Sequence, residues 1–371
     1  MDRRDFVIRG AAGTLGMGVS GCSIFEPEKI HIKQEQTPIE FDKKIPKPQG
    51  SMPMAVIGTT GIKVSKFGFG SHMRQDIVSH EKEREWMVRE AYDLGMNFFD
   101  VYDYEQKCFQ YEPMGRYLAP VMNDVVISIT MWPYEGRTVE QEMERDLRLF
   151  GRDYIDLVRI HAWKDTRNEK ELQNQSGHRW EWWETLFKLK EKGYIRAVGV
   201  PIHLKDDLKQ PLSELPLDFV IFPYNFYHNW TWFEKGTSDV EPALPNIHKK
   251  GIGIVSMKPF AGDYLVTPFK RLAAEYDKSG EVHFTKACLR YVIHSGLPID
   301  ATLGGMYNPY HMYENIDAFF NPEMSDRERM VLKKIRDTAK VFANGLLPEH
   351  YYFLNDWVSD SLDDSDLFDE V

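Results

Sequence analysis

Two residues that can exchange protons or carry charge stand at the ends of short apolar runs. Asp100 follows two phenylalanines in the run 97–101, and His161 closes the run 155–161. An imidazole changes its charge near neutral pH, which suits acid, base or hydrogen-bonding chemistry. In a barrel of parallel strands the active site lies at the carboxyl ends of the strands, so these positions favour functional roles. The alternatives are a helix-capping aspartate and a core histidine.

The elements that must position these residues alternate along the chain. Short apolar runs predict strands, and amphipathic segments, several of which end in glycine, predict helices. The expected strands cover 66–70, 97–101, 125–131, 155–161, 195–202, 219–224, 253–260 and 301–306. The expected helices cover 83–95, 114–121, 139–151, 180–193, 205–215, 240–251, 284–296 and 310–320.

This unbroken alternation predicts an α/β fold, a (β/α)₈ TIM barrel of parallel strands. A doubly wound sheet is the alternative, but no G-x-G-x-x-G follows the first strand. The Gly-Thr-Thr-Gly sequence at 58–61 predicts an N-terminal β-hairpin that plugs the bottom of the barrel. A C-terminal helical extension follows the last unit.

The first 22 residues read as an export signal. A basic head with Arg3-Arg4 and Phe6 precedes a weakly apolar, glycine-rich stretch, which is typical of the twin-arginine route for folded proteins. Val19 to Cys22 has the form of a lipobox, in which Cys22 is acylated and becomes the new N-terminus. The alternative is a chance cysteine within a signal.

Composition divides the remaining chain and limits its partners. Proline-rich, polar residues 23–51 predict a flexible linker, residues 52–345 the barrel, and residues 346–371 a C-terminal extension with an acidic tail. A formal net charge of -11 argues against a nucleic-acid partner. Its 3 cysteines lie far apart without metal-ligand spacing, so we expect neither a metal site nor a structural disulfide.

Several stretches in order along the barrel jointly resemble the aldo/keto reductases. They are 58–64, 95–100, 154–161, 193–199, 223–225 and 304–315. The resemblance implies carbonyl reduction with NADP (or NAD) by a set of Asp, Tyr, Lys and His at the strand ends. Asp100 and His161 match two members of this set. Glu105 occupies the usual tyrosine position, so Tyr104, one residue earlier, is the candidate proton donor; a surface anchor is the alternative.

The lysine of that set is missing. The third strand ends in Met131, or in Thr130 under a one-residue shift, and neither side chain supplies a cation. Lys258 on the seventh strand is the nearest substitute that the architecture suggests. A phenol without a nearby cation is a poor proton donor near neutral pH, so we expect weak activity toward simple aldehydes. Introducing Met131→Lys is then expected to raise this activity if the rest of the site is competent, and to leave it unchanged if the barrel is a binding scaffold.

The resemblance also implies cofactor contacts along the later strands. The candidate positions are Tyr224, Met257, Lys258, Gly304, Gly305, Glu314 and Asn315. Several family contacts are replaced: Pro201-Ile202 stand for Ser-Asn, Ile221 for Gln, Met257 for the stacking tyrosine, and Gly305 and His311 for basic residues. Backbone N–H groups at a helix N-terminus remain as an anion site.

Two tryptophan clusters stand apart from this set. Trp180 and Trp183 have helical spacing and are expected to face the core, whereas residues 230–233 follow the sixth strand among the loops that surround a barrel's active site. The aromatic faces of the segment 230–233 suit a sugar or another flat ligand.

The sequence therefore predicts an oxidoreductase of the cell envelope with a small-molecule substrate, a sugar or another carbonyl compound. It would acquire its cofactor before the twin-arginine translocase exports it, and would be lipid-anchored on the periplasmic side of a membrane. The alternative is a catalytically inactive barrel lipoprotein that serves as a binding or structural protein, because fold alone does not fix function.

Overall fold

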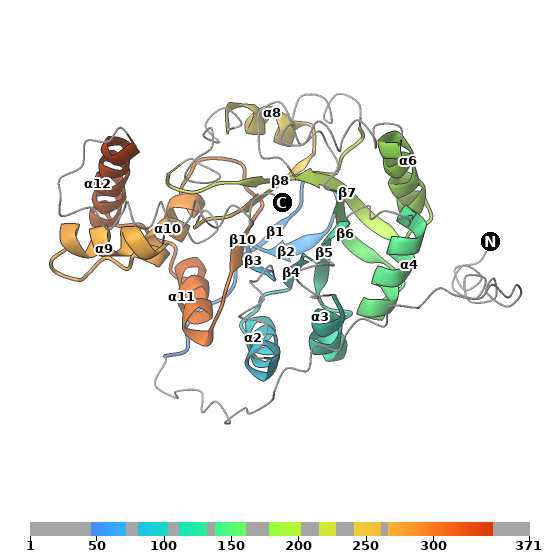
Figure 1. Ribbon diagram of the computed structural model, residues 1–371, viewed down its shortest axis with the longest axis horizontal. Coiled ribbons are helices and arrows are strands. Elements are labelled where there is room, and N and C mark those ends of the chain that lie inside the picture. The colour runs from blue at the N-terminus through green and yellow to red at the C-terminus, as the bar shows by residue number, and fades with distance from the viewer. Residues whose placement is uncertain are drawn as a thin grey trace, which may run out of the picture.

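Eight parallel strands close into a barrel in the order β10-β3-β4-β5-β6-β7-β8-β9 (Figure 1). The computed structural model describes residues 46–71, 81–102, 111–131, 138–160, 178–201, 215–227, 241–260 and 266–343. The barrel strands are β3 (Phe67–Gly70), β4 (Phe98–Val101), β5 (Val126–Met131), β6 (Ile155–Ile160), β7 (Ile195–Pro201), β8 (Phe219–Pro223), β9 (Gly253–Met257) and β10 (Ala301–Gly305). The predicted (β/α)₈ barrel is confirmed, and the doubly wound alternative is wrong.

Helices surround the barrel, as the alternation predicts (Figure 1). They are α2 (Glu81–Asp93), α3 (Tyr111–Leu118), α4 (Val139–Phe150), α6 (His178–Glu191), α8 (Leu244–Lys249), α9 (Val266–Tyr276), α10 (Phe284–Ile293), α11 (Pro309–Phe320) and α12 (Asp326–Ala343), with 3₁₀ turns η1 (Ala119–Val121) and η4 (Glu241–Ala243). Helix α9 is an addition to the predicted helices, and the helix expected at 205–215 lies almost wholly outside the described residues.

Local signals fix the ends of α4. The Thr138 hydroxyl accepts a hydrogen bond from the Gln141 N–H at 3.3 Å, and the Gln141 side chain accepts one from the Thr138 N–H at 2.9 Å. This reciprocal capping box satisfies backbone donors that an α-helix leaves unpaired at its start. At the other end Gly151 adopts a φ of 62°, which a glycine reaches without steric cost.

The barrel interior is filled by large side chains opposite glycines. Phe98, Phe219 and Leu303 belong to the inner apolar cluster. A Cβ atom added at Gly199 would lie 2.5 Å from the Phe219 ring, and one added at Gly68 would lie 2.6 Å from Leu303 Cδ2. Because these side chains occupy the space that the glycines leave, the barrel is a packed core at this level.

The predicted hairpin closes the amino-terminal end of the barrel. Strands β1 (Met54–Val56) and β2 (Lys63–Ser65) pair antiparallel, and their connecting loop packs against the inner cluster through two isoleucines. The Gly58 N–H donates to Asp300 Oδ2 at 3.0 Å, and the Thr59 N–H donates to the Gly251 carbonyl at 2.9 Å. These bonds attach the plug to the segments that precede β9 and β10.

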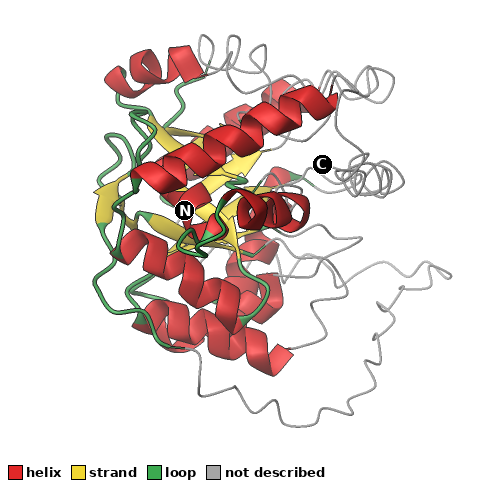
Figure 2. Cartoon of the chain, turned by 90° about the vertical axis from the view of Figure 1, so that its left-hand side faces the viewer, coloured by secondary structure: helices red, strands yellow, loops and turns green. Residues whose placement is uncertain are grey.

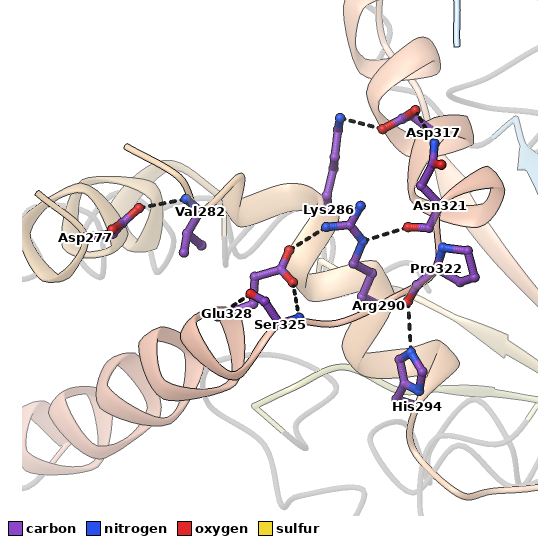
Figure 3. Close-up of polar contacts among 10 residues, drawn as sticks. All are labelled: Asp277, Val282, Lys286, Arg290, His294, Asp317, Asn321, Pro322, Ser325 and Glu328. Atoms are coloured by element: carbon purple, nitrogen blue, oxygen red, sulfur yellow. Dashed lines mark hydrogen bonds and ion pairs between the residues drawn. The ribbon is translucent and has the colours of Figure 1, made fainter. Parts of the chain in front are cut away.

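Helix α12 packs outside the helix layer, against α9 and α10 (Figure 2). Figure 3 shows the polar contacts that attach its start: Arg290 of α10 binds Glu328 at 2.6 Å and the Asn321 carbonyl at 2.9 Å. Glu328 also accepts the Ser325 N–H at 2.8 Å, while the Ser325 hydroxyl accepts the Glu328 N–H. The first turn of α12 is thereby capped and joined to α10.

A carboxylate in the loop after α9 ties the same region together and should make it acid-sensitive. Asp277 accepts hydrogen bonds from the Ser279 hydroxyl (2.7 Å), the Val282 N–H (2.7 Å) and the Arg327 guanidinium (2.6 Å). These contacts, that of Ser279 first, lower the pKa of Asp277 to about 2. An unfolded aspartate has a pKa of about 3.9. The stabilisation is therefore fully present above about pH 4 and disappears as the pH falls toward 2.

We expect Asp277→Asn to have a lower free energy of unfolding than the wild type near neutral pH. This gap, the difference between the two free energies of unfolding, should narrow as the pH falls from about 4 to about 2. Urea unfolding across this pH range measures the gap. Asp337→Asn, which removes an exposed partner of Lys333, is the control and should show no such narrowing. A gap that stays constant down to pH 2 would contradict the assigned role of Asp277.

Candidate functional site

Asp100 lies inside the barrel near the carboxyl end of β4. Along this strand Phe98 belongs to the inner cluster. Phe99 belongs to a second, helix-facing cluster between the barrel and its helices, which includes Met114 of α3 and Leu147 of α4. Strand alternation therefore directs Asp100 inward. Its neighbours in register are Gly70 on β3 and Ser128 on β5. The side chain is 9% exposed, so the carboxylate sits just above the packed interior.

A buried arginine supplies the partner of this carboxylate. Arg159 on β6 contacts Asp100 through the two terminal guanidinium nitrogens, with Nη1 to Oδ1 at 2.5 Å and Nη2 to Oδ2 at 3.0 Å. Nη1 also donates to Ser128 Oγ at 2.9 Å. The pair is bidentate, the geometry in which a guanidinium binds a carboxylate most strongly. Arg159 is thus a cation beside Asp100 that the sequence prediction did not name, whereas the phenol of Tyr104 lies outside the described residues.

The structure resolves which residue ends β5 on the inner side. Ile127, Ile129 and Met131 belong to the cluster that contains the helical residues, so Met131 faces the helices. Thr130 therefore faces inward, and it pairs in register with Arg159. Its Oγ1 is buried and has no hydrogen-bond partner among the described residues. The one-residue shift, rather than Met131, gives the position of the missing lysine.

The predictions for Tyr104, His161, the aromatic segment 230–233 and Cys22 lie outside the described residues, as do those for the acidic tail and most of the linker. His161 directly follows β6, whose last residue is Ile160. Trp183 lies in the helix-facing core as expected, 1% exposed and stacked near Phe187.

Four candidate cofactor residues lie at the end of β10 and within α11: Gly304 and Gly305 end the strand, and Glu314 and Asn315 are in the helix. Gly305 is exposed and pairs in register with Gly70, and a Cβ at Gly305 would meet nothing closer than 3.8 Å. Gly304 has no such room, because a Cβ there would lie 2.7 Å from the Phe67 ring. The buried Asn315 side chain donates to the Gly305 carbonyl at 3.4 Å. Glu314 Oε2 is buried and has no hydrogen-bond partner in the described structure.

The other three candidates differ in their surroundings. Tyr224 is buried in the helix-facing cluster and stacks on Tyr291 of α10 at 6.3 Å, so its ring is part of the core. Burial raises the pKa of the Tyr224 phenol far above its usual value. Met257 ends β9 and packs against the inner cluster, as a residue at the mouth does. Lys258 has a φ of 55°, and its carbonyl accepts a hydrogen bond from Asn225.

A surface cavity of ≈ 570 Å³ lies on the outside of the barrel between α10, α11 and the segment 46–49. Its lining includes Lys47, His283, Lys286, Tyr310, Tyr313 and Glu314. Glu314 thus lines this cavity, and the next residue, Asn315, contacts the Gly305 carbonyl at the end of β10. Across the described ranges, no three His, Cys, Asp or Glu side chains gather closely enough to hold a metal ion.

A closed (β/α)₈ barrel with an acid and its cation near the carboxyl ends of the strands has the architecture of the barrel enzymes. The aldo/keto reductase family model matches residues 66–337. The chain belongs to the aldo/keto reductase family, and is an aldo/keto reductase-like oxidoreductase. Members of this family use NAD(P)H.

The similar proteins match this chain at low identity and over different lengths. L-galactose dehydrogenase from Arabidopsis thaliana is 23% identical over 307 residues, which cover 76% of this chain and 92% of that protein. Methylglyoxal reductase from Yersinia pestis is 29% identical over 125 residues, or 32% of this chain and 40% of that protein. The holo form of an aldo-keto reductase from Bacillus halodurans has a TM-score of 0.59 at 18% identity, covering 76% of this chain and 96% of that one.

Proposed function

We propose that this protein transfers hydride between a nicotinamide cofactor and a carbonyl or alcohol substrate at the carboxyl end of the barrel. The observation that carries the proposal is the bidentate pair of Asp100 and Arg159, buried at the mouth of an aldo/keto reductase barrel. Stability does not require such a pair, because apolar side chains of similar volume often stabilise a buried site as well or better. The inactive-barrel alternative therefore leaves the pair unexplained.

The residues around α11 fit a dinucleotide. Gly70 and Gly305 leave the mouth open between β3 and β10, where no Cβ obstructs the backbone. The unpartnered Glu314 Oε2 is a buried acceptor that a ligand amine or hydroxyl would satisfy. Glu314 and Asn315 would hold the adenosine side, and the N-terminus of α11 would lie near the anionic groups. Met257 would border the nicotinamide side.

The chain's own residues then have separate tasks. When bound, the nicotinamide supplies the hydride that reaches the carbonyl carbon. Tyr104 gives the proton to the carbonyl oxygen, which yields an alcohol, and His161 orients that oxygen through a hydrogen bond. Asp100, fixed by Arg159, belongs to the charged set that tunes the proton donor. The bonds that Arg159 makes to Asp100 and Ser128 hold this set in one geometry.

The relatives support a small polyhydroxylated or dicarbonyl substrate. One is named as a dehydrogenase of L-galactose and another as a reductase of methylglyoxal. We propose a sugar or a short carbonyl compound as the substrate, with the aromatic segment 230–233 as its stacking surface.

Two measurements on the purified protein test this function. Titration with NADPH and NADH, followed by quenching of tryptophan fluorescence, should give saturable binding of at least one cofactor. Oxidation of the bound cofactor should then follow on addition of a compound from a panel of aldoses and short aldehydes. A native protein that binds neither cofactor would refute the proposal.

We also propose that the protein is an envelope lipoprotein with Cys22 as its mature N-terminus. The twin-arginine pair and the lipobox support this location, and the described helices include none long and apolar enough to cross a bilayer. Attachment would then depend on acyl chains at Cys22.

Cys22→Ser should release the protein from the membrane fraction, because the lipidated sulfur is lost. Intact-mass measurement of the wild type should give a chain that begins at acylated Cys22, and Arg3-Arg4→Lys-Lys should remain unexported. Cys108→Ser is the matched control and should stay membrane-bound. A mature chain that retains Met1 would contradict the lipoprotein assignment.

A further inference from the structure

The barrel mouth contains a cation at an unexpected place. Arg159 is the last residue but one of β6, between Val158 and Ile160, and its side chain is 5% exposed. Among the residues that the structure describes, it is the charged side chain within ion-pair distance of Asp100. A charge so deeply placed is costly unless it is paired and hydrogen-bonded, and Asp100 and Ser128 together meet this need.

The position where the family resemblance implies a lysine is occupied by a small hydroxyl. Thr130 faces inward from β5 opposite Arg159, and its Oγ1 is buried without a hydrogen-bond partner among the described residues. Compared with the family pattern, the cation is therefore absent from β5 and present on the neighbouring strand β6. Both side chains project into the same layer, because their residues are direct register partners.

We propose that Arg159 is the positioning residue of this site: it replaces the missing lysine as the fixed positive charge that balances and orients the Asp100 carboxylate. This inference rests on the proposed function for its catalytic part. A guanidinium keeps its charge throughout the pH range in which proteins fold, whereas an amine can lose it. The bidentate geometry also fixes the plane of the carboxylate, which a single ammonium does not do.

Removing Arg159 should therefore change how the site responds to pH. A carboxyl group buried without a counter-charge takes up a proton well above its usual pH range. We expect Arg159→Met to lower kcat by about 10²-fold or more near neutral pH, with part of the activity returning as the pH rises. Arg159→Lys should stay within about 10-fold of the wild type, because it retains a charge with poorer geometry.

The decisive variant moves the cation to the neighbouring strand. Arg159→Met combined with Thr130→Lys places an ammonium where the resemblance expects it, and should recover at least about 10-fold of the lost kcat together with the wild-type pH profile. A residue that served packing alone would not be rescued by a charge on β5. Arg159→Met/Thr130→Met is the matched control, which fills the same space without the charge.

A second readout does not require turnover. In Arg159→Met the folded state binds a proton that the unfolded state releases, so the free energy of unfolding should fall as the pH rises above the pKa of an unfolded aspartate, about 3.9. The wild type and Asp100→Asn/Arg159→Met should lack this slope. If the wild type reduces no substrate, the proposed function fails, and this slope still decides whether Arg159 balances the charge of Asp100.

The expected result is a pH-dependent loss in Arg159→Met that the relocated lysine reverses. A wild-type pH profile and kcat in Arg159→Met, or a flat stability profile in that variant, would overturn the proposal. If Arg159→Met alone does not fold, Arg159→Met/Thr130→Lys is compared with Arg159→Met/Thr130→Met. Equal activity and equal pH dependence in these two double variants would overturn the proposal.

Discussion

Asp100→Asn should lose about 10²- to 10⁴-fold in kcat for carbonyl reduction, the range that positioned proton-transfer groups commonly contribute. The amide cannot carry the charge that tunes the proton donor. It also leaves the Arg159 guanidinium buried beside a neutral group, and breaking a buried ion pair on one side costs about 3–5 kcal/mol of stability. Steady-state kinetics and urea unfolding measure the two effects.

Asp156→Asn is the matched control for this variant. Asp156 is also buried and also binds arginines, with Arg152 Nη1 at 2.8 Å and Arg196 Nη1 at 2.6 Å, but it lies near the amino-terminal end of β6. It should lose comparable stability while kcat stays within a few-fold of the wild type, because this end of a barrel serves stability. Wild-type kcat in Asp100→Asn, or equal losses of kcat in both variants, would show that Asp100 has no catalytic role.

The barrel could be predicted because its elements follow from local patterns. The runs around Asp100 and Arg159 have the apolar character of buried parallel strands, and Thr138 and Gly151 mark the ends of α4 as a capping residue and a left-handed glycine do. Such signals involve residues close in sequence. Predicted and observed strand bounds accordingly differ by at most three residues, and several coincide.

The ion pair could not be predicted in the same way, because its partners lie 59 positions apart and come together through strand register. One signal was present: an arginine flanked by Val158 and Ile160 in a strand run must find a buried partner. Matching motifs to a family fixed Asp100 but also selected Tyr224, whose ring the structure packs among the helices. A motif match gives position along the chain, whereas the face of the strand decides what a side chain touches.

The face of β5 on which residue 131 lies also determines what a lysine introduced there would do. Met131→Lys should not raise activity, contrary to what the sequence alone suggests, because Met131 is 2% exposed within the helix-facing cluster. The ammonium would be buried among apolar side chains, and we expect a loss of stability on the order of 3–5 kcal/mol, the cost of an uncompensated buried charge. Urea unfolding and steady-state kinetics would measure both effects.

Met131→Leu, which conserves volume and apolar character, is the control and should cost less than about 1.5 kcal/mol. The two substitutions occupy the same space, so the difference between them isolates the buried charge from the change of shape. A Met131→Lys variant that folded as stably as Met131→Leu and reduced carbonyls faster than the wild type would mean that residue 131, rather than Thr130, faces the site. The register of β5 against β6 would then have to shift by one residue, and Arg159 would lose Thr130 as its partner.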